Sequence, residues 1–557
     1  MINHYQKVLA SADSLVADLL KMQVLDKGKK GFGGLQALES RLVAPKFSIY
    51  GLKAMLSAYY NQDSVYYQDN GLFKSIEMLV DYIGNVQRED GTFDLLTVNF
   101  YSSPDTAFMV QRLCISHKLI TNFGEDSAKE IKNQLENIIN KAAYGMAAGG
   151  FHTPNHRWVI ASALMMAYNI LDIDEFKLNA EKYLGEGIDC NQDGEFTERS
   201  TGIYNVVNDN ALIILAEETK NWELLDHVER NLKMMLKFIE PDGTIYTGNS
   251  TRQDKGEKYY PDNYYHLYLY MAARLNDKEF SYMAETIIER HNRNTDVQSF
   301  AQSLYLFMFN PELKNFSVPT QEIEEDYEKF YQQSGVLRVR RDDMSFTLTE
   351  NSTQFLEFKA YSLPLALKLS ASFFEIGQFN LNKVDKQWQR ECKTSKIEKN
   401  NDSYQMRFHA HGTYYLPFEE EQEIEWGEMN YDQRKIGREV DLYINLNFKE
   451  IEAGIEVTID TDGCDQVPLK VEFILPADSI IEGDSFLMKG KAGSSLAAKE
   501  GEIKITQGTD TILLDSSFAE HLYTEDMRGT EAMSEHHFTI FYTAFTNLKK
   551  SFKIKKL

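Results

Sequence analysis

A glycine-containing loop that recurs along the first half of the chain constrains the fold most. In each copy a glycine stands at or shortly before a large apolar residue, as at Gly91, Gly149, Gly194 and Gly243. The steps between successive copies are 58, 45 and 49 residues, close to the length of one two-helix hairpin with its loops. Repeated helical hairpins stack in series, either as an open solenoid or as a closed ring. We therefore expect an (α/α) toroid or incomplete barrel, with the glycine loops on one face.

The segments between these loops show the apolar spacing of α-helices. The predicted helices are Phe47–Tyr60, Leu72–Val86, Pro104–Leu119, Pro154–Ile170, Val206–Ala216, Trp222–Phe238, Tyr264–Leu275 and Phe300–Phe309. The fourth of them is apolar on nearly every side, which indicates a buried helix. Residues 1–320 are therefore predicted to form one helical domain.

The pattern changes after residue 320. We interpret the acidic segment Gln321–Glu328 as a helical linker, within a linker region of residues 321–334. Beyond it, alternating apolar residues predict strands at 336–340, 346–349, 442–448, 455–459, 469–474 and 537–545, with turns at 400–402, 460–463 and 500–502. Many antiparallel strands without intervening helices favour a β-sandwich over residues 335–557. A propeller would need a repeat of about 40–50 residues, which the segment lacks.

Charge and cysteine content narrow the function classes. The 557 residues include 59 Lys and Arg against 84 Asp and Glu, so the formal charge is -25. This balance disfavours non-specific binding to nucleic acid or anionic membranes, and any anionic ligand needs a local basic cluster. The four cysteines are far apart, and the N-terminus has no apolar signal segment. We therefore expect a cytoplasmic protein in a reducing compartment; its oligomeric state stays open.

The stretch richest in chemistry is Gly149–Trp158, which reads GGFHTPNHRW. Thr153 suits the N-cap and Pro154 the first helical position, so Asn155, His156 and Arg157 fall in the first helical turn. Helix starts favour anions because of their unpaired N–H groups and the helix dipole. The sequence therefore predicts an anion site here. Alternatively, Asn155 and His156 only satisfy backbone groups at a loop-to-helix junction.

A second polar loop, residues 193–204, reads DGEFTERSTGIY. The phenol of Tyr204 would be a poor base unless cations favoured its phenolate, and Arg157 and Arg199 are candidates for that task. Its simpler interpretation is a hydrogen-bonded core tyrosine. For Glu198 we favour a structural ion pair, with Arg199 as the neighbouring cation.

Two further loops add candidates for ligand binding. In the polar and flexible loop 247–256, Arg252 and Lys255 are suited to gripping an anion, although the loop is equally consistent with a solvated surface. In the loop 99–106, Tyr101 stands among amides and hydroxyls, a composition suited to stacking on sugar rings.

The motif GFHTPNHRW, about 40 residues before DGEFTERSTGIY, resembles the heparinase II/III-like polysaccharide lyases and their alginate-lyase relatives. The resemblance implies an N-terminal (α/α) toroid, a C-terminal β-sandwich and β-elimination at a uronic acid. In that family an Asn-His pair and a later Tyr carry the reaction, and the matching positions here are Asn155, His156 and Tyr204.

The residue types agree with that implication. Removing the C5 proton of a uronate places negative charge on its carboxylate, so an amide and cations directed there stabilise the transition state. We assign proton donation to Tyr204, and the role of base or phenolate activator to His156. The substrate-binding candidates are Arg157, Arg199, Arg252, Lys255, Tyr101 and His152. We expect an acidic oligosaccharide or polysaccharide as the partner.

The chain departs from the family in two ways. It shows no signal peptide, which favours an intracellular enzyme acting on imported oligosaccharides. Relatives also often carry a histidine, and sometimes a metal, in the β domain; here His409 and His411 face one side of a strand, but spacing indicates no carboxylate partner. We expect neither a metal nor a cofactor.

Two other functions stay open. A glycoside hydrolase of the toroid type, acting on unsaturated uronides, would draw its carboxylates from Asp94, Asp105, Glu198 and Asp209. A non-catalytic carbohydrate-binding protein would bind oligosaccharide without converting it.

Overall fold

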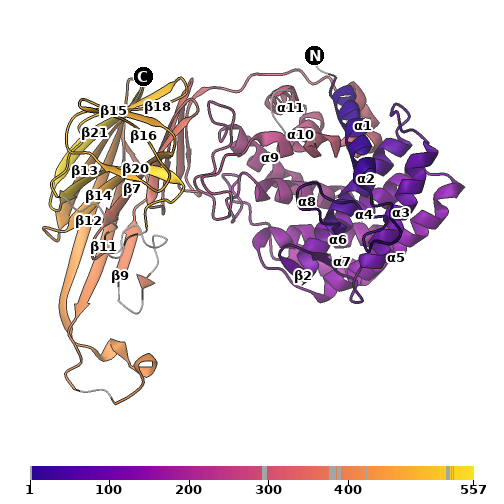
Figure 1. Cartoon of the computed structure of the whole chain (residues 1–557), viewed down its shortest axis with the longest axis horizontal. Coiled ribbons are helices and arrows are strands. Elements are labelled where there is room, and N and C mark those ends of the chain that lie inside the picture. The colour runs from indigo at the N-terminus through magenta and orange to yellow at the C-terminus, as the bar shows by residue number, and fades with distance from the viewer. Residues whose placement is uncertain are drawn as a thin grey trace. The chain divides into compact units, whose positions relative to one another are not determined.

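The structure is a computed structural model that describes residues 3–290, 298–374, 384–385, 390–420, 423–521, 527, 530 and 532–557 (Figure 1). The chain divides into two compact units. The first comprises residues 1–238 and 245–323 and is helical, whereas the second comprises residues 239–244 and 324–557 and is built of strands.

The helical unit is an (α/α) toroid. Its inner helices are α2 (Pro45–Tyr60), α4 (Ser103–Phe123), α6 (Pro154–Leu171), α8 (Tyr204–Thr219) and α10 (Tyr265–Leu275). Each packs on the next, and each also packs on the helix that follows it in sequence: α3 (Asn70–Val86), α5 (Lys129–Ala148), α7 (Asp174–Leu184), α9 (Leu224–Leu236) and α11 (Lys278–Arg290). Helices α12 (Gln298–Ala301) and α13 (Leu304–Phe309) pack against α1 (His4–Met22), and α13 also packs on α2. The first and last helices therefore meet, as a ring requires.

Sequence patterns identified the inner helices but missed α1, α5, α7 and α11. The inner helix α6 is buried on nearly every side, from Trp158 to Ala167. The outer helix α5 buries only a stripe that includes Ile131, Leu135 and Ile138, and the rest of its surface is polar. A narrow stripe of this kind is a weaker helical signal than a continuous apolar segment.

All four glycine loops connect an outer helix to the next inner helix, and the three that lie within the helical unit share one end of the toroid, as predicted. The backbone explains the glycine in two of them. Gly91 and Gly194 have φ angles of +86° and +97°, and a Cβ at either position would collide with a backbone carbonyl oxygen of α5 or α9. The fourth loop differs, because Gly243 belongs to the short segment 239–244 that packs within the β unit.

The β unit is a two-sheet sandwich. Its strands are β3 (Asp326–Tyr331), β4 (Val336–Arg341), β5 (Met344–Thr349), β6 (Gln354–Ala360), β7 (Leu363–Ala371), β8 (Val384–Asp385), β9 (Arg390–Thr394), β10 (Glu398–Asn400), β11 (Ser403–Tyr415), β12 (Ile436–Ile451), β13 (Gly454–Gly463), β14 (Pro468–Pro476), β15 (Ile480–Gly483), β16 (Phe486–Lys489), β17 (Ser495–Ala497), β18 (Ile503–Gln507), β19 (Asp510–Leu514), β20 (His537–Phe545) and β21 (Lys549–Lys556). Within the described ranges one sheet has the order β17-β20-β14-β7-β6-β5-β4-β3, and the other β16-β15-β18-β19-β21-β13-β12-β11-β9-β8, with β10 paired to β11. The pairs are antiparallel except for β17 and β20.

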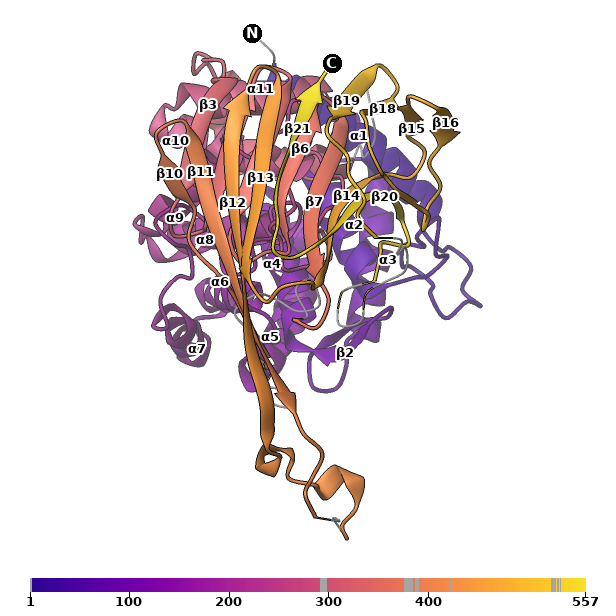
Figure 2. The same cartoon turned by 90° about the vertical axis from the view of Figure 1, so that its left-hand side faces the viewer.

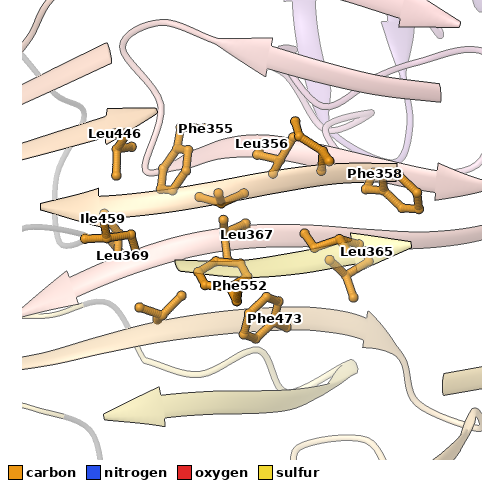
Figure 3. Packing of buried hydrophobic residues seen from close by; sticks show 14 of the residues in the cluster. Phe355, Leu356, Phe358, Leu365, Leu367, Leu369, Leu446, Ile459, Phe473 and Phe552 are labelled. Atoms are coloured by element: carbon orange, nitrogen blue, oxygen red, sulfur yellow. The ribbon is translucent and has the colours of Figure 1, made fainter. Parts of the chain in front are cut away.

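Apolar side chains from both sheets meet in the core (Figure 3). The ring of Phe355 on β6 packs against Phe448 on β12 at 5.9 Å between centroids, and Phe473 on β14 packs against Phe552 on β21 at 5.3 Å. Because these partners belong to different sheets, the contacts establish the predicted sandwich.

Two local predictions in this region were wrong. Residues 321–325 are not helical, and β3 begins at Asp326 inside the segment interpreted as a helical linker. The predicted turn at 460–463 lies within β13, where Asp460 pairs with Asn445 across the ladder. A run of Asp, Thr and Gly is typical of turns, but pairing with both neighbouring strands overrides that local preference here.

Strands β11 and β12 form a long hairpin that projects beyond the neighbouring strands (Figure 2). Aromatic side chains near its end are exposed, including Tyr414 and Trp426.

In the described part of the chain, none of the helices is both long enough and apolar enough to cross a membrane.

Candidate active site

The start of α6 holds a buried amide with an unused donor. Thr153 stands at the N-cap position as predicted, but its hydroxyl donates to Asn155 Oδ1, at 2.6 Å, instead of capping the backbone. Asn155 is fully buried, and within the described ranges its Nδ2 group has no hydrogen-bond partner. A carboxamide nitrogen carries two donors, so Asn155 keeps hydrogen-bonding capacity that an incoming acceptor can use.

The carboxylate of Glu198 links this helix start to the next loops. One oxygen accepts a hydrogen bond from the backbone N–H of Asn155 at 3.1 Å, and the other lies 3.4 Å from Arg252 Nε. Burial raises the pKa of Glu198, while the Asn155 N–H and Arg252 act in the opposite direction. Glu198 is thus in a structural ion pair as predicted, but with Arg252. Arg199 lies 3.5 Å from Glu195 instead.

Tyr204 is the first residue of α8, and its phenol faces a cation. The guanidinium carbon of Arg252 lies 5.0 Å from the centre of the Tyr204 ring. The phenol oxygen accepts a hydrogen bond from Gln253 Nε2 at 2.8 Å. Tyr204 is half-buried and is not a core tyrosine. The cation over its ring is Arg252, and not Arg157 or Arg199 as predicted.

The loops that carry Tyr204 and Arg252 are bound together by a residue that the sequence analysis missed. Asp254 is fully buried and accepts hydrogen bonds from Ser200 Oγ, the Gly202 N–H and Ser250 Oγ, at 2.9, 2.9 and 2.5 Å. The loop 247–256 was predicted to be flexible, whereas this carboxylate anchors its centre. An acidic residue within a polar loop gave no signal of that role, because its partners Ser200 and Gly202 lie some fifty positions away.

His156 is half-buried beside the same helix start, and its Nδ1 accepts a hydrogen bond from the backbone N–H of His152 at 3.4 Å. Its ring packs edge-on against Phe108 at 6.3 Å between centroids and against His152 at 6.1 Å. Burial lowers the pKa of His156 from 6.5 to about 4; Asp105 opposes this shift, and His152 and Arg252 add to it. The imidazole is therefore neutral at pH 7, the form that accepts a proton.

We expect His156 to titrate near pH 4 in the folded protein, measured by NMR of the imidazole nitrogens, with a His156→Gln variant to assign the signals. Since its folded pKa is lowered, the neutral ring stabilises the fold above about pH 6.5, and that contribution is lost as the pH falls toward 4. A titration midpoint near 6.5 would contradict the buried, neutral imidazole.

The other predicted binding residues divide into paired and exposed side chains. Arg157 lies 2.9 Å from Glu186 and 3.5 Å from Asp189, so two carboxylates already neutralise its charge. Tyr101 is exposed, and Arg88 stacks on its ring at 4.4 Å. Lys255 and His152 are also exposed. Among the residues that the structure describes, Arg252 is the predicted cation that lies beside both Glu198 and Tyr204.

The two histidines singled out on β11, His409 and His411, do have a carboxylate neighbour. His409 Nε2 and His411 Nδ1 lie 2.8 and 3.0 Å from the same oxygen of Asp441, which is directly opposite His411 on β12. Sequence spacing does not reveal it, because the partner comes from another strand. Within the described ranges no group of three or more His, Cys, Asp or Glu side chains has the arrangement of a metal site.

No protein-family model matches the chain, and no curated protein matches its sequence. Solved structures, however, match its fold over nearly the whole length. Heparinase III aligns over 98% of this chain and 84% of its own, with a TM-score of 0.54 and 9% identity. The Streptomyces coelicolor A3 chondroitin AC lyase, solved in complex with chondroitin sulphate, aligns over 100% of this chain and 80% of its own, with a TM-score of 0.52 and 9% identity.

The fold is that of the heparinase-type polysaccharide lyases. A Paenibacillus xanthan lyase also matches, over 99% of this chain, with a TM-score of 0.52 and 9% identity; this chain spans 57% of the length of that enzyme. At 9% identity these structural alignments establish a shared fold and no more. The reaction therefore has to be argued from the side chains.

Proposed function

We propose that the protein is a polysaccharide lyase that cleaves uronic-acid-containing glycans by β-elimination. The observation that carries the proposal is the buried amide of Asn155, whose Nδ2 donor is unused among the described residues. A buried unsatisfied donor is costly unless a ligand uses it. Its surroundings supply a cation, a neutral imidazole and a phenol, in Arg252, His156 and Tyr204.

The proposed reaction uses each of these groups once. Asn155 Nδ2 donates to the uronate carboxylate, and Arg252 adds positive charge as the C5–H bond breaks. The C5 proton passes to neutral His156, the C4=C5 double bond forms, and the C4–O bond breaks. Tyr204 protonates the leaving oxygen. The proton on His156 then returns through solvent to the Tyr204 phenolate, so the cycle consumes no water.

The positions of the carboxylates support elimination over hydrolysis. Asp94 is paired with Arg88, and Asp105 accepts hydrogen bonds from Asn99 and Ser102 near the start of α4. Asp209 is fully buried, and burial raises its pKa well above the ordinary value. Glu198 is held by Asn155 and Arg252. A hydrolase needs two carboxyl groups placed around the glycosidic bond. Here Asp94, Asp105 and Glu198 are already engaged in ion pairs or hydrogen bonds, and Asp209 is fully buried.

A screen of acidic glycans tests the proposal. Heparan sulfate, hyaluronan, alginate and acidic plant or algal polymers, with their short oligomers, should be incubated with the full chain while ultraviolet absorbance is recorded. Elimination conjugates the new double bond with the carboxylate, so at least one substrate should give rising absorbance together with new reducing ends. Cleavage without absorbance would instead indicate a hydrolase, and binding without cleavage a carbohydrate-binding protein.

A further inference from the structure

A cavity of about 470 Å³ lies among the inner helices of the toroid. Its wall includes Tyr50 and Lys53 on α2, Arg112 on α4, Asn210 on α8 and Tyr305 on α13. The volume falls within the range of about 300–1,000 Å³ that is usual for small-molecule sites. Aromatic rings combined with amides are a lining suited to sugar rings.

The charged side chains that line this cavity are all basic. Its lining contains Lys46, Lys53 and Arg112, whereas among the residues that the structure describes it contains no Asp or Glu. The chain as a whole has a formal charge of -25, so the charge of this lining is opposite in sign to the net charge of the protein. Cations without carboxylates make the cavity attractive to an anion.

The two deepest cations have only neutral partners in the described structure. Lys53 is 6% exposed; its ammonium donates to the Gln302 carbonyl oxygen at 2.9 Å and lies 4.6 Å from the centre of the Tyr305 ring. Arg112 donates to the Phe108 carbonyl oxygen at 3.2 Å, and its guanidinium carbon lies 4.8 Å from the centre of the Tyr50 ring.

A buried charge without a counter-ion destabilises a fold. Burial lowers the pKa of Lys53 well below its ordinary value, and the nearby charge of Arg112 adds to that effect. An anion between the two side chains would favour the charged form of Lys53 and offset its repulsion by Arg112. The position of Lys53, buried beside the partly buried Arg112 with no carboxylate in the cavity lining that the structure describes, is therefore better explained by an anionic ligand than by the stability of the fold alone.

A neighbouring cavity provides an internal comparison. It shares Asn210, His266 and Tyr305 with the first cavity and also contains two lysines. There, however, Lys118 is paired with Glu218, and Lys220 lies 3.8 Å from Glu217. The positive charge is thus a property of the first cavity and not of the toroid interior in general.

The positive cavity adjoins the candidate active site. Phe108 lines it, and the ring of Phe108 also packs against His156 at 6.3 Å between centroids. Val206 and Val207 line it as well, and they follow Tyr204 in the first turn of α8. A glycan with one sugar at His156 and Tyr204 therefore has an adjacent hollow for a neighbouring unit.

We propose that this cavity is a subsite for a second anionic sugar of the glycan, with its carboxylate or sulfate group held between Lys53 and Arg112. The inference rests on the proposed function, because it assumes that the adjoining residues act on a glycan. It adds that the substrate carries charge on a unit next to the one that is cleaved.

Calorimetry with sodium glucuronate and with inorganic sulfate tests this subsite, with glucose as the neutral probe and ionic strength held constant with chloride. The native chain should bind glucuronate, sulfate or both, and should bind glucose far more weakly. Lys53→Met and Arg112→Met should each weaken anion binding about tenfold or more, because each removes a charged hydrogen-bond donor. Lys74→Met, at an exposed lysine on α3, is the matched control and should bind as the native chain does.

Folding of the key variant is not an obstacle, since replacing an uncompensated buried charge with an apolar side chain is neutral or stabilising. Lys53→Met should therefore unfold at the native temperature or above it. Anion binding that is absent in the native chain, or equal in native, Lys53→Met and Arg112→Met proteins, would overturn the subsite.

The subsite and the proposed function fail separately. Tyr204→Phe should keep Lys53-dependent binding even though it loses catalysis. Lyase activity without that binding would reject the subsite alone, and binding without any lyase activity would reject the reaction alone.

Discussion

Replacing Tyr204 with Phe should lower kcat by about 10²–10⁴-fold, because the leaving oxygen would depart without its proton donor. The substitution removes one hydroxyl, whose hydrogen bond in the structure comes from the side chain of Gln253. Half-buried Tyr204 contributes little to the core through that hydroxyl, so the variant should unfold at nearly the native temperature. The measurement is the rate of ultraviolet absorbance increase on the best substrate from the glycan screen.

Tyr260→Phe is the matched control. Tyr260 is an exposed tyrosine in the same unit, between the Arg252 loop and α10, and it has no part in the proposed reaction. Loss of activity in Tyr204→Phe together with retention in Tyr260→Phe would support the assignment. Full activity in Tyr204→Phe would show that another group protonates the leaving oxygen.

Replacing Glu240 with Gln should destabilise the β unit by about 3–5 kcal/mol, because it leaves a buried guanidinium without its counter-charge. Arg338 is fully buried on β4, and its Nη1 lies 2.9 Å from Glu240 Oε1. The other oxygen of Glu240 accepts a hydrogen bond from Ser345 at 2.5 Å. Burial favours the neutral acid, but Arg338 and Lys359 outweigh it and hold the pKa of Glu240 below its ordinary value.

Denaturant unfolding of the native and variant chains measures this effect. Since the folded pKa of Glu240 is lowered, its contribution should be present above about pH 4.5 and should be lost as the pH falls below that value. Asp402→Asn is the control: it breaks the exposed pair with Lys449, at 2.7 Å in the same unit, and should lower the free energy of unfolding far less than Glu240→Gln does. Equal losses in the two variants would contradict a special role for the buried pair.

The sequence predicted the layout of the fold because its strongest signals are local. Pro154–Ile170 is apolar almost throughout and became the inner helix α6, and the alternating residues 469–474 became part of the buried strand β14. The outer helices α5 and α7 were missed because most of their surface is polar. The segment 239–244 could not be assigned to the β unit, because its partners, such as Arg338, lie about a hundred positions away.

The candidate site was likewise predictable from the sequence only where the signal is local. The helix start at Thr153 and Pro154 was predictable from residue preference, and it places Asn155 and His156 correctly in the first turn. Which cation serves the site was not predictable. Three arginines were candidates, and only the folded loops show that Arg252 faces Tyr204 while Arg157 is paired with carboxylates elsewhere.

The most direct test of the central claim is mass spectrometry of the products formed in water enriched in oxygen-18. Elimination creates the double bond from the substrate alone, so the unsaturated product should carry no solvent oxygen at the cleaved linkage. Incorporation of one oxygen-18 atom per cleaved bond, with no unsaturated sugar, would establish hydrolysis and contradict the proposed roles of Asn155, His156 and Tyr204.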